Sequence, residues 1–185
     1  QKETKENAHL YYEINRDLAI EVAKKAKKDG VKQFIFLSSM SVYGMDTGVI
    51  TKETKPNPKT NYGKSKLQAE EQIADLRDDS FKACVLRPPM VYGDGCKGNY
   101  QTIVKLIKKF PVFPRVNNKR SLIHIDALVL FIKTAVDNVF DVLYFPQDKE
   151  YVRTIDLAKK IAKQENKKIY FSFLLGLVVI IFRPF

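Results

Sequence analysis

The chain has 185 residues, of which 45% are hydrophobic and 29% charged, so its composition excludes a disordered protein and fits a domain with a core. Its formal net charge of +11 favours anionic partners such as nucleotides and phosphates, but the lysines are dispersed and no DNA- or RNA-binding motif is present, so nucleic acid is not expected as a partner. Cys84 and Cys96 lack metal-ligand spacing, which predicts no metal site. Two unpatterned cysteines and the lack of a signal peptide predict a cytoplasmic protein.

The first half of the chain alternates helical and extended patterns. Apolar residues at helical spacing predict a helix over residues 7–29. The apolar run at 31–38 is typical of a buried parallel strand, and a second run at 82–86 predicts another. Residues 45–61 contain prolines, glycine and asparagines, which predicts a loop that leads into a helix over 62–76.

The second half continues the alternation. Two short strands are predicted, at residues 121–125 and 143–145. Three helices are predicted, at residues 100–109, 127–136 and 154–164. Thr154 is expected to cap the last helix. Alternating strands and helices indicate an α/β fold built on a parallel sheet.

Residues 171–182 form an apolar tail. The segment is too short to cross a bilayer as a helix, which needs about 20 residues, so the sequence predicts no transmembrane segment. Two interpretations remain, a core or subunit-contact element and a peripheral membrane attachment. The tail has no amphipathic charge pattern, which favours the first interpretation.

Tyr62 and Lys66 are the residues that point most directly to chemistry. Their spacing places both side chains on one face of a helix, one turn apart. An ammonium held near a phenol is expected to lower the pKa of the phenol from about 10 towards neutrality. A hydroxyl from another segment, such as Ser39, can complete a proton-handling site. The pair alone is a weak signal, because this spacing occurs on many helices.

Five segments in a fixed order resemble the motifs of one enzyme family. They are residues 11–15, 30–44, 62–66, 86–93 and 120–126, which read YYEIN, GVKQFIFLSSMSVYG, YGKSK, LRPPMVYG and RSLIHID. Together they resemble the extended short-chain dehydrogenase/reductase family, and within it the NAD-dependent nucleotide-sugar epimerases and dehydratases. The fourth segment and the Lys-Gly-Asn that follows it look most like UDP-glucose 4-epimerases of bacterial surface-polysaccharide synthesis.

The resemblance implies a partial Rossmann-like, doubly wound parallel sheet with part of a small C-terminal substrate domain. Residues 1–95 would form the C-terminal half of the dinucleotide-binding domain. Residues 96–185 would supply mostly substrate-binding segments, with 120–145 partly returning to the Rossmann sheet. The family's glycine-rich turn should lie before Asn15, where the sequence has no such motif. The chain is therefore expected to be a fragment that lacks the N-terminal half of the domain.

The resemblance also implies catalytic roles for Ser39, Tyr62 and Lys66. Tyr62 would be the acid/base on the sugar hydroxyl, Lys66 would tune it and bind the nicotinamide ribose, and Ser39 would hydrogen-bond the reacting oxygen. Ser41 is a less favoured substitute for Ser39. NAD is the implied cofactor; it would take a hydride from the sugar, leave a transient 4-keto intermediate and return the hydride to the other face.

The implied binding residues lie along the same motifs. The cofactor-binding set is Leu37, Ser38, Tyr62, Lys66, Pro89 and Val91. The substrate-binding set is Ser39, Ser41, Asn99 and Arg120. In that set Asn99 and Arg120 would hold the diphosphate of a UDP-sugar, because a guanidinium fits phosphate oxygens; a surface ion pair is the alternative for Arg120.

Three more residues of these motifs have less specific interpretations. Asn15 is expected to be structural and to bond backbone near the site. Tyr43 and Tyr92 are each expected to end a strand, in a Val-Tyr-Gly segment, and they fit either packing or the lining of a sugar pocket.

The predicted reaction is 4-epimerisation of a UDP-hexose, with two alternatives, of which the first is a nucleotide-sugar dehydratase or reductase of the same scaffold. Dehydratases of this scaffold carry an acidic pair after the catalytic hydroxyl, where this chain has Met40 and Ser41, so epimerase or simple oxidoreductase chemistry is favoured. The other alternative is a non-catalytic remnant or binding module. The chain alone is expected to be inactive or weak. The helices at 7–29 and 62–76 resemble those that pair in the family's homodimer, whereas the identity of the sugar and its N-acetylation stay open.

Overall fold

The structure, a computed structural model, describes residues 4, 6–96 and 99–182. Two units make up the chain. Unit 1 comprises Gln1–Pro89 and Val129–Pro146, and unit 2 comprises Met90–Leu128 and Gln147–Phe185. Each unit has its own hydrophobic cluster, so the two are described separately.

Unit 1 is built on a three-stranded parallel sheet with β2 (Lys82–Leu86) between β1 (Gln33–Leu37) and β6 (Val142–Tyr144). The registers pair Phe36 with Val85 and Val85 with Leu143. The central strand is the most buried of the three, as expected where parallel strands are covered on both faces. The strands predicted at 31–38, 82–86 and 143–145 are confirmed, with ends shifted by up to two residues.

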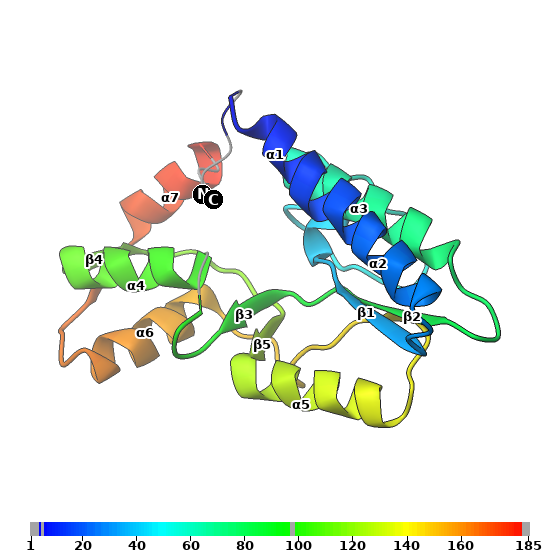
Figure 1. Ribbon diagram of the computed structural model, residues 1–185. Helices are drawn as coiled ribbons and strands as arrows, with labels where there is room; N and C mark the ends of the chain where they lie inside the picture. The colour runs from blue at the N-terminus through cyan, green and yellow to red at the C-terminus, as the bar shows by residue number, and fades with distance from the viewer. Residues whose placement is uncertain (1–3, 5, 97–98, 183–185) are drawn as a thin grey trace. The chain divides into compact units, whose positions relative to one another are not determined.

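One face of this sheet is covered by two helical segments that run side by side in the same direction, and the second half of α5 (Ile125–Asp137) lies on the other face (Figure 1). The first segment is a single helical run of α1 (Ala8–Tyr12), η1 (Glu13–Leu18) and α2 (Ala19–Lys28). Its middle part, η1, is π-helical, so the helix predicted at 7–29 is confirmed but is not uniformly α. The second segment is α3 (Asn61–Ala74), close to the predicted 62–76.

The core of unit 1 lies between these helices and the sheet. Ile73 of α3 and Phe81 are fully buried, and Ala23 of α2 packs into the same cluster. Cys84 is also fully buried in β2, and burial raises the pKa of its thiol to about 11. A thiol of that kind behaves as a small apolar core residue, as the sequence predicted.

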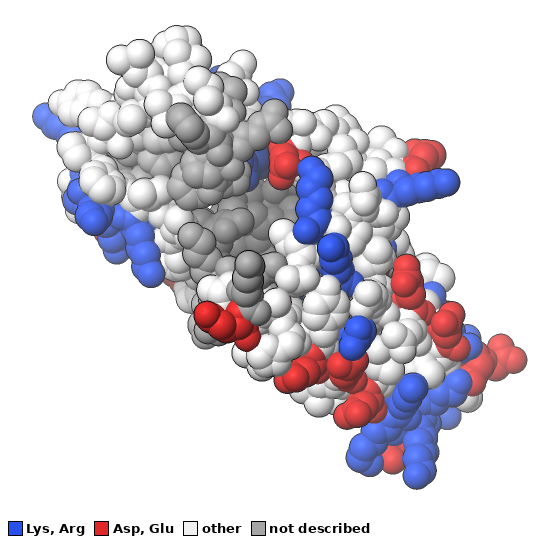
Figure 2. Space-filling model, turned by 90° about the horizontal axis from the view of Figure 1, so that it is seen from above, with Lys and Arg blue, Asp and Glu red and all other residues white. Residues whose placement is uncertain are grey.

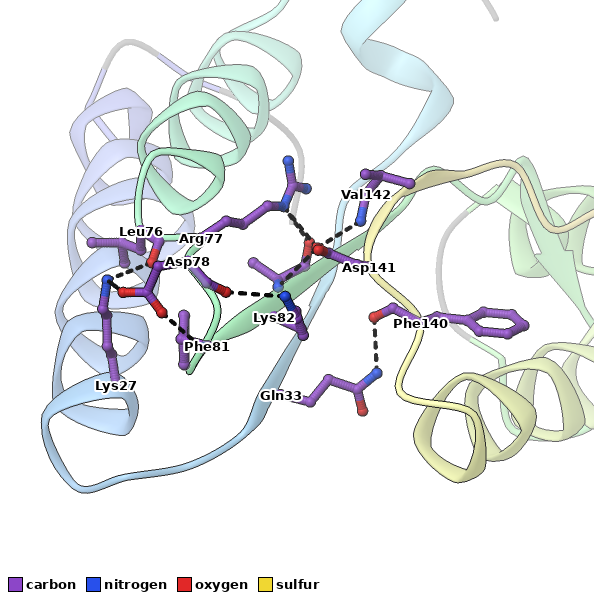
Figure 3. Close-up of polar contacts among 11 residues, drawn as sticks. Lys27, Gln33, Leu76, Arg77, Asp78, Phe81, Lys82, Phe140, Asp141 and Val142 are labelled. Carbon is purple, nitrogen blue, oxygen red and sulfur yellow. Dashed lines mark hydrogen bonds and ion pairs between the residues drawn. The ribbon is translucent and has the colours of Figure 1, made fainter.

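Polar side chains fasten the segments at the amino-terminal edge of the sheet (Figure 3). Asp141, just before β6, accepts from the backbone N of Ala83 at 3.2 Å and pairs with Arg77 Nε at 3.1 Å. Gln33 Nε2 donates to the carbonyls of Ala135 and Phe140 at 2.8 and 2.9 Å. These bonds satisfy backbone groups at the strand ends that would otherwise lose their partners on burial.

Unit 2 contains two small parallel sheets of two strands each. β3 (Met90–Tyr92) pairs with β5 (Leu122–His124), and β4 (Val112–Pro114) pairs with β7 (Tyr170–Ser172). The helices of this unit are α4 (Asn99–Lys109), α6 (Thr154–Gln164) and α7 (Phe173–Phe182). Ile107, Phe113 and Ile161 form its core.

Unit 2 departs from the sequence predictions at several places. The three-residue strands β4 and β7 were not predicted, whereas β3 confirms the strand expected to end at Tyr92. In unit 1, the prediction that Tyr43 ends a strand is wrong, because β1 ends at Leu37 and Tyr43 lies in a 3-10 turn. Of the segment 120–145, β6 joins the main sheet, whereas β5 pairs with β3 in a separate sheet. The prediction that Thr154 caps α6 is wrong, because Thr154 is already the first helical residue and the N-cap is Arg153, which has no capping side-chain bond.

The apolar tail forms β7 and the ten-residue helix α7. Several of its side chains face solvent, with Phe173 65% and Leu174 74% exposed, so α7 is not a core element among the described residues. None of the helices described in residues 4–182 is both long and apolar enough to cross a bilayer, in agreement with the sequence prediction.

Charged side chains of both signs are interspersed on the face seen in Figure 2, rather than gathered in one basic field. On α2, Lys25 pairs with Asp29 and Lys27 with Asp78, each at 2.6 Å. Such pairs solvate a helix face, which accounts for much of the lysine content of this segment.

Replacement of Ile73 by alanine tests the packing of unit 1. Ile73 is fully buried, so Ile73→Ala should lower the free energy of unfolding by about 2–5 kcal/mol. Ile14→Ala is the matched control, because Ile14 is 57% exposed and its truncation should change stability by less than about 0.5 kcal/mol. Urea unfolding followed by circular dichroism measures both, and equal losses would contradict the assigned core.

Candidate active site

Ser39 begins the short 3-10 turn η2 (Met40–Tyr43) that follows β1. Its Oγ accepts a hydrogen bond from the Ser41 backbone N at 3.1 Å, which caps the turn, and donates to Ser41 Oγ at 3.1 Å. The turn ends at Gly44, whose φ of 60° is left-handed. The Ser39 hydroxyl is thereby held at the carboxyl end of a parallel strand, the edge at which open α/β sheets bind ligands.

The first turn of α3 lies directly against this serine turn. Thr60 caps the helix, because its Oγ1 accepts from the Gly63 backbone N at 3.1 Å. A Cβ on Gly63 would lie 2.6 Å from the Ser41 carbonyl oxygen and 3.0 Å from Pro58 Cβ. Only glycine permits this approach, so Gly63 sets the distance between the helix that carries Tyr62 and the turn that carries Ser39.

Tyr62 is half-buried at the start of α3. Burial raises the pKa of Tyr62, while a hydrogen bond with Ser39 acts in the opposite direction and lowers it in part. The prediction that Lys66 brings this pKa towards neutrality is therefore wrong for the chain as it stands. The physical reason is that the phenol loses solvent, and the ammonium is directed to another group.

That other group is the end of β1. Lys66 Nζ donates to the Leu37 carbonyl at 2.8 Å and lies 4.6 Å from the centre of the Phe36 ring. Burial lowers the pKa of Lys66, and the charge of Glu70, one helical turn further along α3, raises it in part. The contact joins α3 to the strand that leads into Ser39.

The π-helical segment also reaches the Tyr62 helix. Asn15 Nδ2 donates to Ser65 Oγ at 3.3 Å, and Ser65 Oγ donates to the Tyr62 carbonyl at 3.0 Å. The prediction that Asn15 bonds backbone is wrong, because its partner is the Ser65 hydroxyl, and its structural role stays a prediction. The Tyr11 ring meets the Tyr62 ring edge-on with centroids 6.2 Å apart.

Tyr62 also lines a pocket of about 220 Å³. The other lining residues come from the first helical run and its entry: Asn7, Leu10, Tyr11, Ile14 and Asn15. Apolar and polar groups thus face the same open pocket beside Tyr62.

A family assignment follows from this arrangement and from comparison with known proteins. Residues 1–143, most of the chain, match the model of the NAD dependent epimerase/dehydratase family. The chain belongs to this family. The match includes every segment that holds Ser39, Tyr62 and Lys66, and it confirms the resemblance seen in the sequence.

Individual relatives are similar over most of this chain. A UDP-glucose 4-epimerase of Vibrio cholerae is 35% identical over 162 residues, which are 83% of this chain and 49% of that protein. An N-acetyl-alpha-D-glucosaminyl-diphospho-ditrans,octacis-undecaprenol 4-epimerase of Escherichia coli O157:H7 is 31% identical over 86% of this chain and 50% of that protein. The chain therefore spans about half the length of the curated relatives it matches.

Solved structures share the fold. The UDP-glucuronic acid 4-epimerase of Bacillus cereus in complex with NAD has a TM-score of 0.78 at 20% identity, over 92% of this chain and 58% of that one. The UDP-Glc/GlcNAc 4-epimerase of Campylobacter jejuni has a TM-score of 0.75 at 20% identity, over 90% of this chain and 60% of that one. The predicted Rossmann-like α/β fold is confirmed.

Most of the predicted site residues lie together in unit 1. Leu37, Ser38 and Ser39 follow one another along the end of β1, Ser41 belongs to the turn after it, and Tyr62 and Lys66 face that end from α3. Pro89 is the last residue of the first stretch of this unit. Their catalytic and binding roles stay predictions.

The other three predicted residues belong to unit 2. Val91 lies in β3 and Asn99 is the first residue of α4, but the Asn99 side chain is outside the described part of the structure. Arg120 is exposed, with its backbone bridged to Val152. Within residues 4, 6–96 and 99–182 no carboxylate pairs with its guanidinium, so the ion-pair alternative finds no support there.

Sequence reasoning missed the buried residues behind this site. Glu70 and Arg87 are 5% and 6% exposed and pair with each other, and Tyr43 bonds the same guanidinium at 2.8 Å. Tyr43 is thus a packing residue, one of the two interpretations left open. Arg87 belongs to the fourth of the five motifs, residues 86–93. It directly follows the apolar run of β2, and that position was the one signal in the sequence that its side chain is buried.

Replacement of Gly63 by alanine tests the close approach of α3 to the serine turn. Helix propensity alone would make Gly63→Ala stabilising by about 1 kcal/mol. Because the new Cβ would lie 2.6 Å from the Ser41 oxygen, the variant should instead be destabilised by at least about 1 kcal/mol. Lys64→Ala, an exposed position of the same turn, is the control and should stay near wild type in thermal unfolding. A Gly63→Ala variant at least as stable as wild type would refute the contact.

Proposed function

We propose that this chain carries the proton-transfer half of an NAD-dependent nucleotide-sugar 4-epimerase that acts on a UDP-hexose. The observation that carries the proposal is the convergence of Ser39, Tyr62 and Lys66 at the end of β1, in a segment that matches the family model. The identity with the UDP-glucose 4-epimerase of Vibrio cholerae, 35% over most of this chain, supports the choice of reaction.

The side chains suggest distinct tasks. Tyr62, with its raised pKa, is a neutral phenol in the chain alone and can exchange a proton with a sugar hydroxyl. Ser39 lies close enough to Tyr62 to lower the pKa of the phenol in part, so it can hold the same reacting oxygen next to the phenol. Lys66, anchored on the Leu37 carbonyl, would favour the ionised phenol once a ligand closes the site and strengthens their interaction.

Two features of unit 1 fit a nicotinamide cofactor. Ser38 is 5% exposed, and its Oγ has no hydrogen-bond partner among the described residues. Buried hydroxyls normally have a partner, so a polar group of a bound ligand could bond Ser38 at the end of β1. The Lys66 ammonium lies at the same strand end and can donate to ribose hydroxyls. When bound, NAD supplies the acceptance and return of a hydride. No glycine-rich turn for its pyrophosphate occurs before Asn15.

The turn after Ser39 disfavours the dehydratase alternative. Elimination of water needs an extra acid and base beside the catalytic hydroxyl, whereas the turn has Met40 and Ser41 there. Ser41 Oγ accepts from Ser39, which makes it a support of that hydroxyl rather than a second acid.

Unit 2 suits an anionic substrate. It contains 15 Lys and Arg against six Asp and Glu, whereas unit 1 contains 17 against 15. Arg120 is exposed and can fork onto a diphosphate, with Asn99 as its proposed companion. The same proposal places the protein in the cytoplasm and gives it a role in bacterial surface-polysaccharide synthesis. The similarity to the diphospho-undecaprenol sugar 4-epimerase supports that role. The proposal also includes a homodimer that pairs residues 7–29 and 62–76.

Replacement of Tyr62 by phenylalanine tests the reaction. In the intact protein Tyr62→Phe should lower the rate of UDP-glucose/UDP-galactose exchange by at least about 100-fold, because the acid/base group is lost. Tyr151→Phe, at a tyrosine that is 57% exposed, should leave turnover unchanged. Unchanged exchange in Tyr62→Phe would sink the proposed mechanism.

Calorimetry with NAD tests what this chain can do by itself. The 185-residue chain should bind NAD weakly and turn over nucleotide sugar slowly or not at all, because it has no glycine-rich turn before Asn15. Tight NAD binding by this chain would contradict that expectation and point to another pyrophosphate site.

A further inference from the structure

A buried ionic cluster lies behind the candidate site. Arg87 donates from Nε to both carboxylate oxygens of Glu70 at 3.1 Å, and its Nη2 also bonds Glu70 Oε2. Its Nη1 donates to Tyr43 Oη at 2.8 Å, and its guanidinium carbon lies 5.1 Å from the centre of the Tyr43 ring. All three residues are at most 6% exposed.

Each member of the cluster comes from a different element of the site. Glu70 lies on α3, one turn beyond Lys66 and two beyond Tyr62. Tyr43 is the last residue of the turn that Ser39 caps. Arg87 follows β2, and its backbone N donates to the Tyr144 carbonyl at 3.0 Å, which fixes it in the sheet. The guanidinium therefore joins the helix of Tyr62 and the turn of Ser39 through one rigid, planar group.

Stability alone is a poor explanation for such a cluster. Two charges removed from water cost several kcal/mol each in general, and well-packed apolar residues often stabilise a core as much as a buried ion pair does. What a bidentate, fully bonded pair adds is a fixed geometry, since few other arrangements satisfy all its donors and acceptors.

We infer that Glu70, Arg87 and Tyr43 are positioning residues for the reaction proposed above: they fix the Ser39 turn against the Tyr62 helix. The inference rests on the proposed function for its catalytic meaning. The positioning itself is a property of unit 1 and can be measured without substrate.

The surroundings of Lys66 explain why a nearby carboxylate matters. The groups that face its ammonium are the Leu37 carbonyl and the Phe36 ring of β1, and the carboxylate of Glu70 acts on it from the same helix. Burial lowers the pKa of Lys66, and Glu70 is the charge that opposes this effect. Removal of that charge leaves the burial effect uncompensated.

Two conservative variants separate the parts of the cluster. Glu70→Gln keeps the shape but removes the charge, and Tyr43→Phe removes one hydroxyl while it keeps the ring over the guanidinium. Glu71→Gln, an exposed neighbour on the same helix, is the matched control. The pKa of Lys66 is read by NMR of labelled lysine, and that of Tyr62 by the tyrosinate absorbance that Tyr62→Phe removes.

Glu70→Gln should lower the pKa of Lys66, and Tyr43→Phe should raise the pKa of Tyr62 by loosening its bond to Ser39, while Glu71→Gln changes neither. In the intact protein both cluster variants should lower kcat by about 10- to 100-fold with little change in KM, as expected of misplaced catalytic groups. If Glu70→Gln fails to fold, Tyr43→Phe alone decides.

Unchanged titration of both Lys66 and Tyr62 in folded variants would overturn the inference. Shifted titrations in a protein that shows no epimerase turnover even as wild type would support the positioning and refute the proposed function instead. The two failures are therefore distinguishable.

Discussion

The contact between Gly63 and the Ser41 carbonyl is the constraint on which the candidate site depends. Two elements with different origins, a strand-end turn and a helix start, meet there without an intervening side chain. The loop before α3 adapts to this contact, since Thr60 caps the helix and Asn57 donates its backbone N to the Val42 carbonyl at 3.0 Å. Proton transfer between groups on separate elements needs such a short, rigid spacing, because errors of an ångström in position are costly.

Long apolar runs and the order of motifs were sufficient to predict the main sheet and its covering helices. β1 and β2 are recognisable in the sequence as nearly continuous apolar runs, because parallel strands are buried on both faces. The three-residue strands β4 and β7 were not predictable, since each is too short for a period and its partner is distant in sequence. The predicted N-cap at Thr154 was wrong because the sequence does not fix the first residue of a helix. A threonine at the first helical position cannot be distinguished in the sequence from one at the N-cap, which here is Arg153.

The site shows the same division between local and tertiary information. Ser39, Tyr62 and Lys66 were predicted from residue type, from the local spacing of Tyr62 and Lys66, and from the order of the motifs along the chain. The raised pKa of Tyr62 and the burial of Glu70 and Arg87 depend on what packs around them, and no local pattern distinguishes a buried ion pair from two surface charges.

The π-helical segment Glu13–Leu18 has a consequence for how this gene can change. A π-turn holds one residue more than the α-turn it replaces. It therefore sets how far α1, which carries Tyr11 and Tyr12, is rotated about the helix axis relative to α2, which packs on the core. Deletion of a single codon within it would restore a plain α-helix and rotate the preceding side chains by about 100° around the axis. Tyr12 would lose its bond to Asn61 Oδ1 at 2.9 Å, and Tyr11 would leave the Tyr62 ring. Length, as well as residue identity, is therefore under constraint in this part of the reading frame.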